Sequence, residues 1–148
     1  VQLRENYLPG CLREGRRYLP GSWRIYDASE QPHCRTHVPA VRARGSGYIV
    51  NISSLAGKKG MSGTAAYSAS KFGMIGLSQC LLEEAKAHNI RVTALCPGYV
   101  ATPLAKDADV PPSEMIQPED IAATVLYLLD LTPKVVIREI VIERIGAV

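Results

Sequence analysis

Residues 48–54 read Tyr-Ile-Val-Asn-Ile-Ser-Ser, an apolar and β-branched run that ends in two hydroxyl side chains. A run of this length and composition, preceded by turn residues at 45–47, predicts a buried strand. Residues 53–63 are rich in glycine, serine and lysine, which predicts a loop. The segment therefore predicts one strand of a sheet with a polar loop at its carboxyl end.

The rest of the chain alternates between helical and strand patterns. Helices are predicted over 64–88 and 117–130, and strands over 90–96 and 135–142. Asn89 is a plausible stop for the first of these helices. Alternating strands and helices predict an α/β fold, in which a parallel sheet is covered by helices.

Charge is unevenly distributed along the chain. Residues 1–45 hold eight arginines, no lysine and four acidic residues, a net charge of +4. Residues 46–148 hold three arginines, six lysines and ten acidic residues, a net charge of −1. The first segment also shows no sustained helical or strand period. We therefore divide the chain into an atypical arginine-rich segment, 1–45, expected to be irregular and poorly ordered, and a folded part, 46–148.

The arginine-rich segment has more than one interpretation. One is a basic arm that binds nucleic acid or another acidic surface, but its aromatic residues form no recognisable platform and no nucleic-acid partner is expected. Another is a segment never selected for folding. Out-of-frame translation of a GC-rich gene also produces an arginine-only bias, and translating the genomic DNA in its other frames tests that hypothesis.

Ligands bind open parallel sheets at the carboxyl ends of the strands, here the loops after Ile52 and Cys96. Tyr67 and Lys71 stand four residues apart on one face of the helix predicted over 64–88. A phenol is a poor acid or base at neutral pH, and a nearby ammonium favours its ionised form. The pair could then exchange a proton with a substrate hydroxyl or carbonyl. Alone, a Tyr-x-x-x-Lys pair is weak evidence, since most such pairs are surface neighbours.

Two further features strengthen the case for chemistry. Ser54 leaves the end of its strand thirteen residues before Tyr67, where its hydroxyl can hydrogen-bond a carbonyl oxygen held between it and the phenol. Pro97 and Gly98 follow the next strand, with Thr102 four residues beyond. A rigid turn and a small residue let backbone approach a flat ring closely.

Three motifs in this order and at this spacing resemble the short-chain dehydrogenase/reductase family. They are Asn51-Ile52-Ser53-Ser54-Leu55-Ala56-Gly57, Tyr67-Ser68-Ala69-Ser70-Lys71 and Pro97-Gly98-Tyr99-Val100-Ala101-Thr102. The resemblance runs from Pro39 to the C-terminus. It implies the C-terminal, catalytic part of a doubly wound, Rossmann-like parallel sheet, incomplete in this chain. The implied reaction is reversible hydride transfer between NAD or NADP and a small-molecule carbonyl or alcohol.

The same resemblance implies roles for individual residues. Tyr67 would be the catalytic acid and base, and Lys71 would favour its ionised form and hydrogen-bond the nicotinamide ribose. Ser54 would orient and polarise the substrate carbonyl. Val100 would contact the cofactor carboxamide through its backbone, and Thr102 would contact the cofactor through its hydroxyl. The implied catalytic set is Ser54, Tyr67 and Lys71, and the implied cofactor-binding set is Tyr67, Lys71, Pro97, Gly98, Val100 and Thr102.

Other features of the family are missing. Residues 1–45 contain no Thr-Gly-x-x-x-Gly-x-Gly loop to hold the pyrophosphate, and no residue that selects NAD over NADP can be assigned. Tyr26 and Asp27 occupy the region where the catalytic asparagine is expected. Missing strands would leave the strand at 48–52 without neighbours on one side. The alternative to an active enzyme is therefore an inactive truncated or frame-shifted remnant that binds no cofactor.

The helix predicted over 64–88 has a second implied role, because in this family it usually packs against a partner subunit. Gly73 and Gly76 would permit close approach of another backbone, so a homo-oligomer is possible. The same glycines could instead fit the helix against its own sheet. The polar tail of the helix, 83–86, is expected to face water. Its apolar positions include Phe72, Ile75, Leu77, Leu81 and Leu82.

Other residues of the motifs are assigned structural roles. Ser53 is interpreted as a strand-end hydrogen-bonding residue, and Ser68 and Ser70 as small packing residues. The glycines at 57, 60 and 63 follow a strand and precede a helix, but their spacing is wrong for a phosphate loop.

The cysteines indicate neither a disulfide framework nor a metal site. Cys80 and Cys96 lie in apolar segments and are expected to be buried reduced thiols, and Cys11 and Cys34 have no closely spaced partner. The stretch His33–His37 superficially resembles a ligand cluster, but no second pair supports it. No apolar run approaches the roughly 18 residues of a membrane span, and no signal-peptide pattern is present, so a cytoplasmic protein without a membrane partner is expected.

Overall fold

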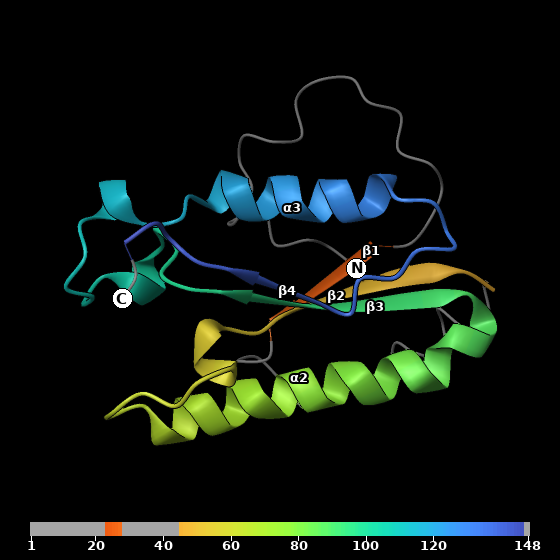
Figure 1. Ribbon diagram of the computed structural model, residues 1–148, viewed down its shortest axis with the longest axis horizontal. Coiled ribbons are helices and arrows are strands. Elements are labelled where there is room, and N and C mark those ends of the chain that lie inside the picture. The colour runs from red at the N-terminus through yellow and green to blue at the C-terminus, as the bar shows by residue number, and fades with distance from the viewer. Residues whose placement is uncertain (1–22, 28–44, 147–148) are drawn as a thin grey trace.

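The computed structural model describes residues 23–27 and 45–146 (Figure 1). Most of the arginine-rich segment lies outside these ranges, and with it the predictions made for Cys11, Cys34 and the stretch His33–His37. The prediction that residues 1–45 are poorly ordered also stays a prediction.

Parallel strands form one sheet in the described residues, and helices cover both of its faces (Figure 1). The strands, in their order across the sheet, are β1 (Trp23–Asp27), β2 (Gly47–Ile52), β3 (Ile90–Pro97) and β4 (Glu139–Ile142). The helices are α2 (Ala65–Ala85) and α3 (Pro118–Asp130), with short 3₁₀ turns η3 (Leu55–Gly57), η4 (Lys86–His88), η5 (Pro103–Ala105) and η6 (Pro112–Glu114). The predicted α/β fold with a parallel sheet is confirmed.

Each face of the sheet has its own core. Ile49 of β2 belongs to a cluster formed with α2 and β3, whereas its neighbours Tyr48 and Val50 belong to a cluster with Val125 and Leu128 of α3. Successive side chains of a strand point to opposite faces, so consecutive apolar residues of β2 supply both cores. β2 is apolar at these positions because both of its faces are buried.

The structure adds a strand that the sequence pattern does not predict. β1 pairs in parallel with β2, in a register that runs from Trp23 opposite Tyr48 to Asp27 opposite Ile52. β2 therefore has a neighbour on each side, and the expectation that it lacks one is wrong. A five-residue run containing two charged residues shows no decisive alternation, so its strand character becomes visible only through its partner.

The long helix ends as predicted, but it is apolar on both sides. α2 passes into η4, and Asn89 takes the left-handed conformation at φ 55° that stops the helix. Phe72 and Leu77, counted among its apolar positions, are exposed on its outer side. Cys80 is also exposed, so the prediction that it is buried is wrong, whereas that for Cys96 is confirmed. A helix with apolar residues all round does not reveal from its sequence which face meets the sheet.

The end of the chain pairs over a shorter stretch than the predicted strand at 135–142. β4 begins only at Glu139. Side chains of β3 hold the preceding segment instead, since Thr93 donates to a backbone carbonyl just before β4 and Arg91 donates to carbonyls further upstream. Side-chain hydrogen bonds from β3 thus replace backbone pairing in this segment. A run of apolar residues in the sequence does not reveal that replacement.

The helix predicted over 117–130 is confirmed as α3, and its start is fixed by a capping box. The backbone N–H of Gln117 donates to the Asp120 carboxylate at 2.8 Å, and the Gln117 side chain accepts from the N3 backbone. Pro118 occupies the first turn, where its missing N–H costs nothing. The acidic residues there also lie at the positive end of the helix dipole.

Neither helix in ranges 23–27 and 45–146 is long and apolar enough to cross a membrane. Within the same ranges, His, Cys, Asp and Glu side chains form no group of three or more that could hold a metal ion.

Candidate active site

The loops after β2 and β3 meet at the carboxyl edge of the sheet. The backbone N–H of Ser53 donates to the carbonyl of Leu95 at 2.7 Å, which extends the pairing one residue beyond β2. The hydroxyl of Ser54 then points across to the carbonyl of Pro97, 3.5 Å away. Two predicted site loops, separated by more than forty residues of chain, are therefore neighbours.

The 3₁₀ turn η3, which follows Ser54, fixes the position of its side chain. Its backbone is extended, it stands at the N-cap of η3, and its oxygen accepts the N–H of Ala56 at 3.1 Å. That hydrogen bond fixes the position of the oxygen and leaves the hydroxyl proton to the long contact with Pro97. A hydrogen bond of 3.5 Å is weak, so the proton can be redirected to a better acceptor at little cost.

Tyr67 and Lys71 lie together on the first turns of α2, as the spacing predicts. The Lys71 ammonium is 5.5 Å from the centroid of the Tyr67 ring, and it donates to the carbonyl of Ile52 at 3.3 Å. The lysine side chain is only 5% exposed, whereas Tyr67 is 39% exposed. A buried ammonium thus stands under an accessible phenol, at the end of the strand that leads to Ser54.

The loop after β3, residues 98–102, is shaped by a short bridge to Ile116, which follows η6. Ile116 donates to the carbonyl of Tyr99 and accepts from the N–H of Ala101, at 3.0 and 2.9 Å. In a parallel bridge of this kind, the N–H of the middle residue, Val100, points away from the partner. The carbonyl of Val100 accepts from the N–H and hydroxyl of Thr102, which folds the loop back.

Pro97 and Gly98 connect this loop to the sheet. The N–H of Gly98 donates to the carbonyl of Ile142 at 2.8 Å, so the turn is tied to the end of β4. A Cβ at Gly98 would meet described atoms no closer than 3.7 Å, which is ordinary van der Waals contact. Packing within the described fold therefore does not demand a glycine there.

Sequence patterns did not identify two buried contacts that hold the site together. Ser53 donates its hydroxyl to the backbone carbonyl of Lys71 at 2.8 Å, and Asn51 donates its amide to the hydroxyl of Ser78 at 2.8 Å. Both join the end of β2 to α2. The assignment of Ser53 to a hydrogen-bonding role is correct, but its partner lies eighteen residues away and no sequence signal names it.

The packing role predicted for Ser68 and Ser70 is correct for the first and wrong for the second. Ser68 is buried, as a packing residue should be. Ser70 is exposed, and its hydroxyl donates to the carbonyl of Tyr67 at 2.6 Å on the same helix, so the packing prediction for it is wrong. The glycines at 57, 60 and 63 also separate, since only Gly57 meets other atoms closely.

Cys96 lies beneath the site in an environment that keeps its thiol protonated. Burial raises the pKa of Cys96 to about 11, and the Glu139 carboxylate contributes to the increase while the Lys58 ammonium opposes it. Lys58 and Glu139 form an ion pair at 2.8 Å that joins the loop after η3 to β4. The thiol is fully buried and is therefore unsuited to act as a nucleophile.

This difference between two cysteines gives a direct chemical prediction. In the folded protein at mildly alkaline pH, iodoacetamide should modify the exposed Cys80 and leave Cys96 intact, because only an accessible thiolate reacts. Timed alkylation followed by peptide mapping measures both rates. In denaturant the two rates should converge. Equal rates in the folded protein would contradict the described packing of β3.

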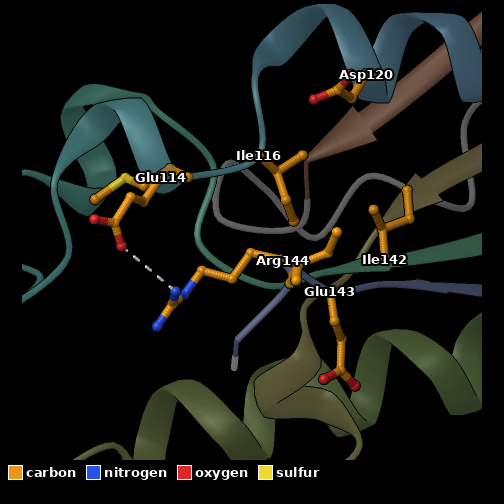
Figure 2. A pocket seen from close by; sticks show the side chains of 8 residues that line it. Glu114, Ile116, Asp120, Ile142, Glu143 and Arg144 are labelled. Atoms are coloured by element: carbon orange, nitrogen blue, oxygen red, sulfur yellow. Dashed lines mark ion pairs between the residues drawn. The ribbon is translucent and has the colours of Figure 1, made fainter. Parts of the chain in front are cut away.

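A cavity of about 340 Å³ opens at the carboxyl end of β4 (Figure 2). Arg144 reaches across it to Glu114, with the two charged groups 3.8 Å apart. Ser54, Tyr67 and Lys71 do not line it. Its lining consists of Glu114, Met115, Ile116, Asp120, Ile142, Glu143, Arg144 and Ile145.

Comparison with known proteins identifies the family and the fold. The model of the family described as short chain dehydrogenase matches residues 32–111, more than half of the chain. The chain belongs to the short-chain dehydrogenase family. The match includes Ser54, Tyr67, Lys71 and the whole loop from Pro97 to Thr102.

This chain matches only part of the length of each relative. An acetoacetyl-CoA reductase of Acinetobacter sp. (strain RA3849) is 44% identical over 94 residues, which are 57% of this chain and 38% of that protein. The structure of a 3-oxoacyl-[acyl-carrier protein] reductase with bound NAD from Brucella melitensis matches with TM-score 0.64 and 30% identity, over 75% of this chain and 45% of that one.

A metagenomic short-chain oxidoreductase in complex with NADP matches with TM-score 0.57 and 37% identity, over 72% of this chain and 42% of that one. The predicted Rossmann-like fold class is confirmed by these structures. The chain spans less than half the length of the proteins it resembles here.

Proposed function

We propose that this chain carries the catalytic site of an NAD- or NADP-dependent oxidoreductase that interconverts a carbonyl and an alcohol. One observation supports the proposal above the others: the buried Lys71 ammonium lies under the accessible Tyr67 ring, at the end of the strand that leads to Ser54. Most Tyr-x-x-x-Lys pairs lie on an exposed helix surface, where both side chains are solvated. Here only the lysine is buried, and a buried ammonium requires that its charge be used or compensated inside the protein.

The residues divide the work of proton transfer and carbonyl orientation. The Ser54 hydroxyl gives up its weak contact with Pro97 and donates to the substrate carbonyl oxygen. Tyr67 donates its phenolic proton to the same oxygen in reduction and takes it back in oxidation. Lys71, fixed against the Ile52 carbonyl, stabilises the negative charge that this transfer leaves on the phenol. The nicotinamide cofactor, when bound, supplies or accepts the hydride.

The residues present fit the nicotinamide end of such a cofactor. The N–H of Val100 points away from the bridge to Ile116, which supports its proposed role as a donor to the cofactor carboxamide. Thr102 places a hydroxyl beside Val100, and Gly98 has no side chain to keep a flat ring from the backbone. These residues, with Tyr67 and Lys71, are the proposed cofactor contacts. The 148 residues contain no glycine-rich loop for the pyrophosphate.

For the substrate we propose a 3-oxoacyl thioester as the first class to test. Two of the relatives are named for reduction of acetoacetyl-CoA and of a 3-oxoacyl group on an acyl carrier protein. Both substrates present a ketone to the same chemistry. Acetoacetyl-CoA is therefore the substrate of choice, with a simple ketone as the comparison.

Cofactor competence can be measured before any turnover. NADH and NADPH are titrated separately into the purified chain while nicotinamide fluorescence is followed, and we expect saturable enhancement with at least one of them. Val100→Pro, which removes the proposed carboxamide donor, should weaken binding. The absence of any binding at millimolar concentration would refute cofactor binding by this chain and favour the inactive alternative.

We also propose that α2 pairs with the same helix of a second copy. Its outer side carries Phe72, Gly73, Gly76 and Leu77, all exposed, and a Cβ at either glycine would meet no described atom within 4 Å. Within the described residues, packing against its own sheet therefore does not explain the glycines. Each of them costs roughly 1 kcal/mol of helix stability relative to alanine, and a close helix–helix contact would offset that cost.

Sedimentation velocity tests this association. The wild-type chain is expected to sediment as a dimer or larger species, and Gly76→Arg should shift it to monomer by placing a long charged side chain in the contact. Lys59→Arg in the loop serves as a control for added arginine. A wild-type protein that remains monomeric at high concentration would exclude the interface.

A further inference from the structure

Lys71 is held at two points by two consecutive residues at the end of β2. Its ammonium donates to the carbonyl of Ile52 at 3.3 Å, and its own backbone carbonyl accepts the hydroxyl of Ser53 at 2.8 Å. Ser54 is the next residue along the chain. The side chain of Ser53 is almost fully buried, so its hydrogen bond to α2 is shielded from water.

Gly57 lets α2 come this close. A Cβ at Gly57 would lie 2.8 Å from both the carbonyl carbon and the carbonyl oxygen of Lys71, and 2.9 Å from the hydroxyl oxygen of Ser53. Real Cβ atoms do not approach backbone so closely, so any larger residue would push α2 away from the strand end. The glycine is thus required by a contact at Lys71 itself.

One more contact fixes Ser53 from the sheet side. Its backbone N–H donates to the carbonyl of Leu95 at 2.7 Å, which anchors it to β3. Ser53 therefore stands between the rigid central strand and the helix that carries Tyr67 and Lys71.

We propose that Ser53 is a positioning residue for the catalytic lysine. Its hydrogen bond to the Lys71 carbonyl, together with that of the Lys71 ammonium to Ile52, forms a clamp on the lysine, and Gly57 leaves the space that this clamp requires. The inference rests on the proposed function, because positioning matters only where Lys71 and Tyr67 act together with Ser54. The hydroxyl of Ser53 sets the height of the first turns of α2 above the end of β2. That height determines whether the lysine ammonium reaches the Ile52 carbonyl and stays buried.

The acylation rate of Lys71 measures how well the clamp keeps the lysine buried, and the measurement does not require catalytic turnover. The folded chain is treated with limiting acetic anhydride, and the modification rate of each lysine is obtained by peptide mapping. Ser53→Ala should raise the rate at Lys71 roughly tenfold, the effect of losing one buried hydrogen bond. Ser53→Thr, which keeps the hydroxyl, should restore the wild-type rate. The rate at the exposed Lys86 should not change in any variant.

A matched control separates positioning from a general loss of stability. Ser70→Ala removes a hydroxyl from the same motif that bonds only within α2, so it should leave Lys71 protected. Amide hydrogen exchange of β3, measured in parallel, should stay unchanged in Ser53→Ala, because global unfolding would expose every buried amide together.

Gly57→Ala approaches the same contact from the other side. It should raise acylation of Lys71 as Ser53→Ala does, although Ser53 keeps its hydroxyl. If Lys71 stays protected in both variants, the clamp does not exist, whatever the chain does with cofactor. If Lys71 becomes reactive while wild-type protein binds no nicotinamide cofactor, the positioning stands and the proposed function fails. If wild-type protein does turn over, Ser53→Ala should lower kcat with little change in KM.

Discussion

Replacing Tyr67 by phenylalanine is expected to lower the rate of acetoacetyl-CoA reduction by roughly 10²–10⁴-fold, the range that a single acid–base group contributes. The substitution removes only the phenolic oxygen. Because the ring is 39% exposed and keeps its place above Lys71, the fold should be unchanged. The measurement is NADPH or NADH consumption at saturating substrate, with circular dichroism to verify the fold.

Tyr127→Phe is the matched control for that experiment. Tyr127 is also exposed, but it lies on α3, on the opposite face of the sheet, so its variant should retain the wild-type rate. Undiminished turnover in Tyr67→Phe would remove Tyr67 from the role of acid and base. Equal losses in both variants would point to a general effect of removing a surface hydroxyl.

The largest expected effect on stability comes from Leu128. Its side chain is 0% exposed and packs in one cluster with Tyr48, Val50 and Leu95, joining α3 to the centre of the sheet. Leu128→Ala should lower the free energy of unfolding by about 2–5 kcal/mol, because it removes buried methyl groups and leaves a cavity. Urea denaturation followed by far-ultraviolet circular dichroism gives the change in midpoint and slope.

Leu126 supplies the control on the same helix. It is 39% exposed, so Leu126→Ala makes an identical chemical change with little loss of burial and should cost well under about 1 kcal/mol. A cost as large as that of Leu128→Ala would show that the outer side of α3 is covered. Comparable small costs for both would mean that α3 does not pack on the sheet as described.

Elements defined by local signals were predictable from the sequence. α3 begins where Gln117, Pro118 and Asp120 specify a capped start, and the turn η4 that continues α2 ends where Asn89 takes a left-handed conformation. Both the capped start and the left-handed stop depend on residues close together in the chain, so they can be recognised in the sequence. β1 was not predictable, since its identity depends on the pairing with β2 and five residues carry too little pattern.

The faces of α2 show the limit of patterning most clearly. Apolar residues occur on both sides of it, and only the sheet determines that Leu81 and Leu82 are buried while Phe72 and Leu77 are exposed. The error made for Cys80 has the same origin. Where a helix has two apolar sides, burial is decided by what packs against it rather than by its own period.

For the site, the sequence by itself determined the family and indicated which residues to propose as catalytic. Ser54, Tyr67 and Lys71 are recognisable because a helix brings residues four apart onto one face and because a polar residue after a buried strand lies at the ligand edge of the sheet. The tertiary structure decided how they are held: Ser54 against Pro97, and Lys71 between Ile52 and Ser53. Those contacts join residues 18 to 43 positions apart. The partners of Lys71 depend on how α2 packs on the sheet, and that of Ser54 depends on the pairing of β2 with β3. No local pattern records either arrangement.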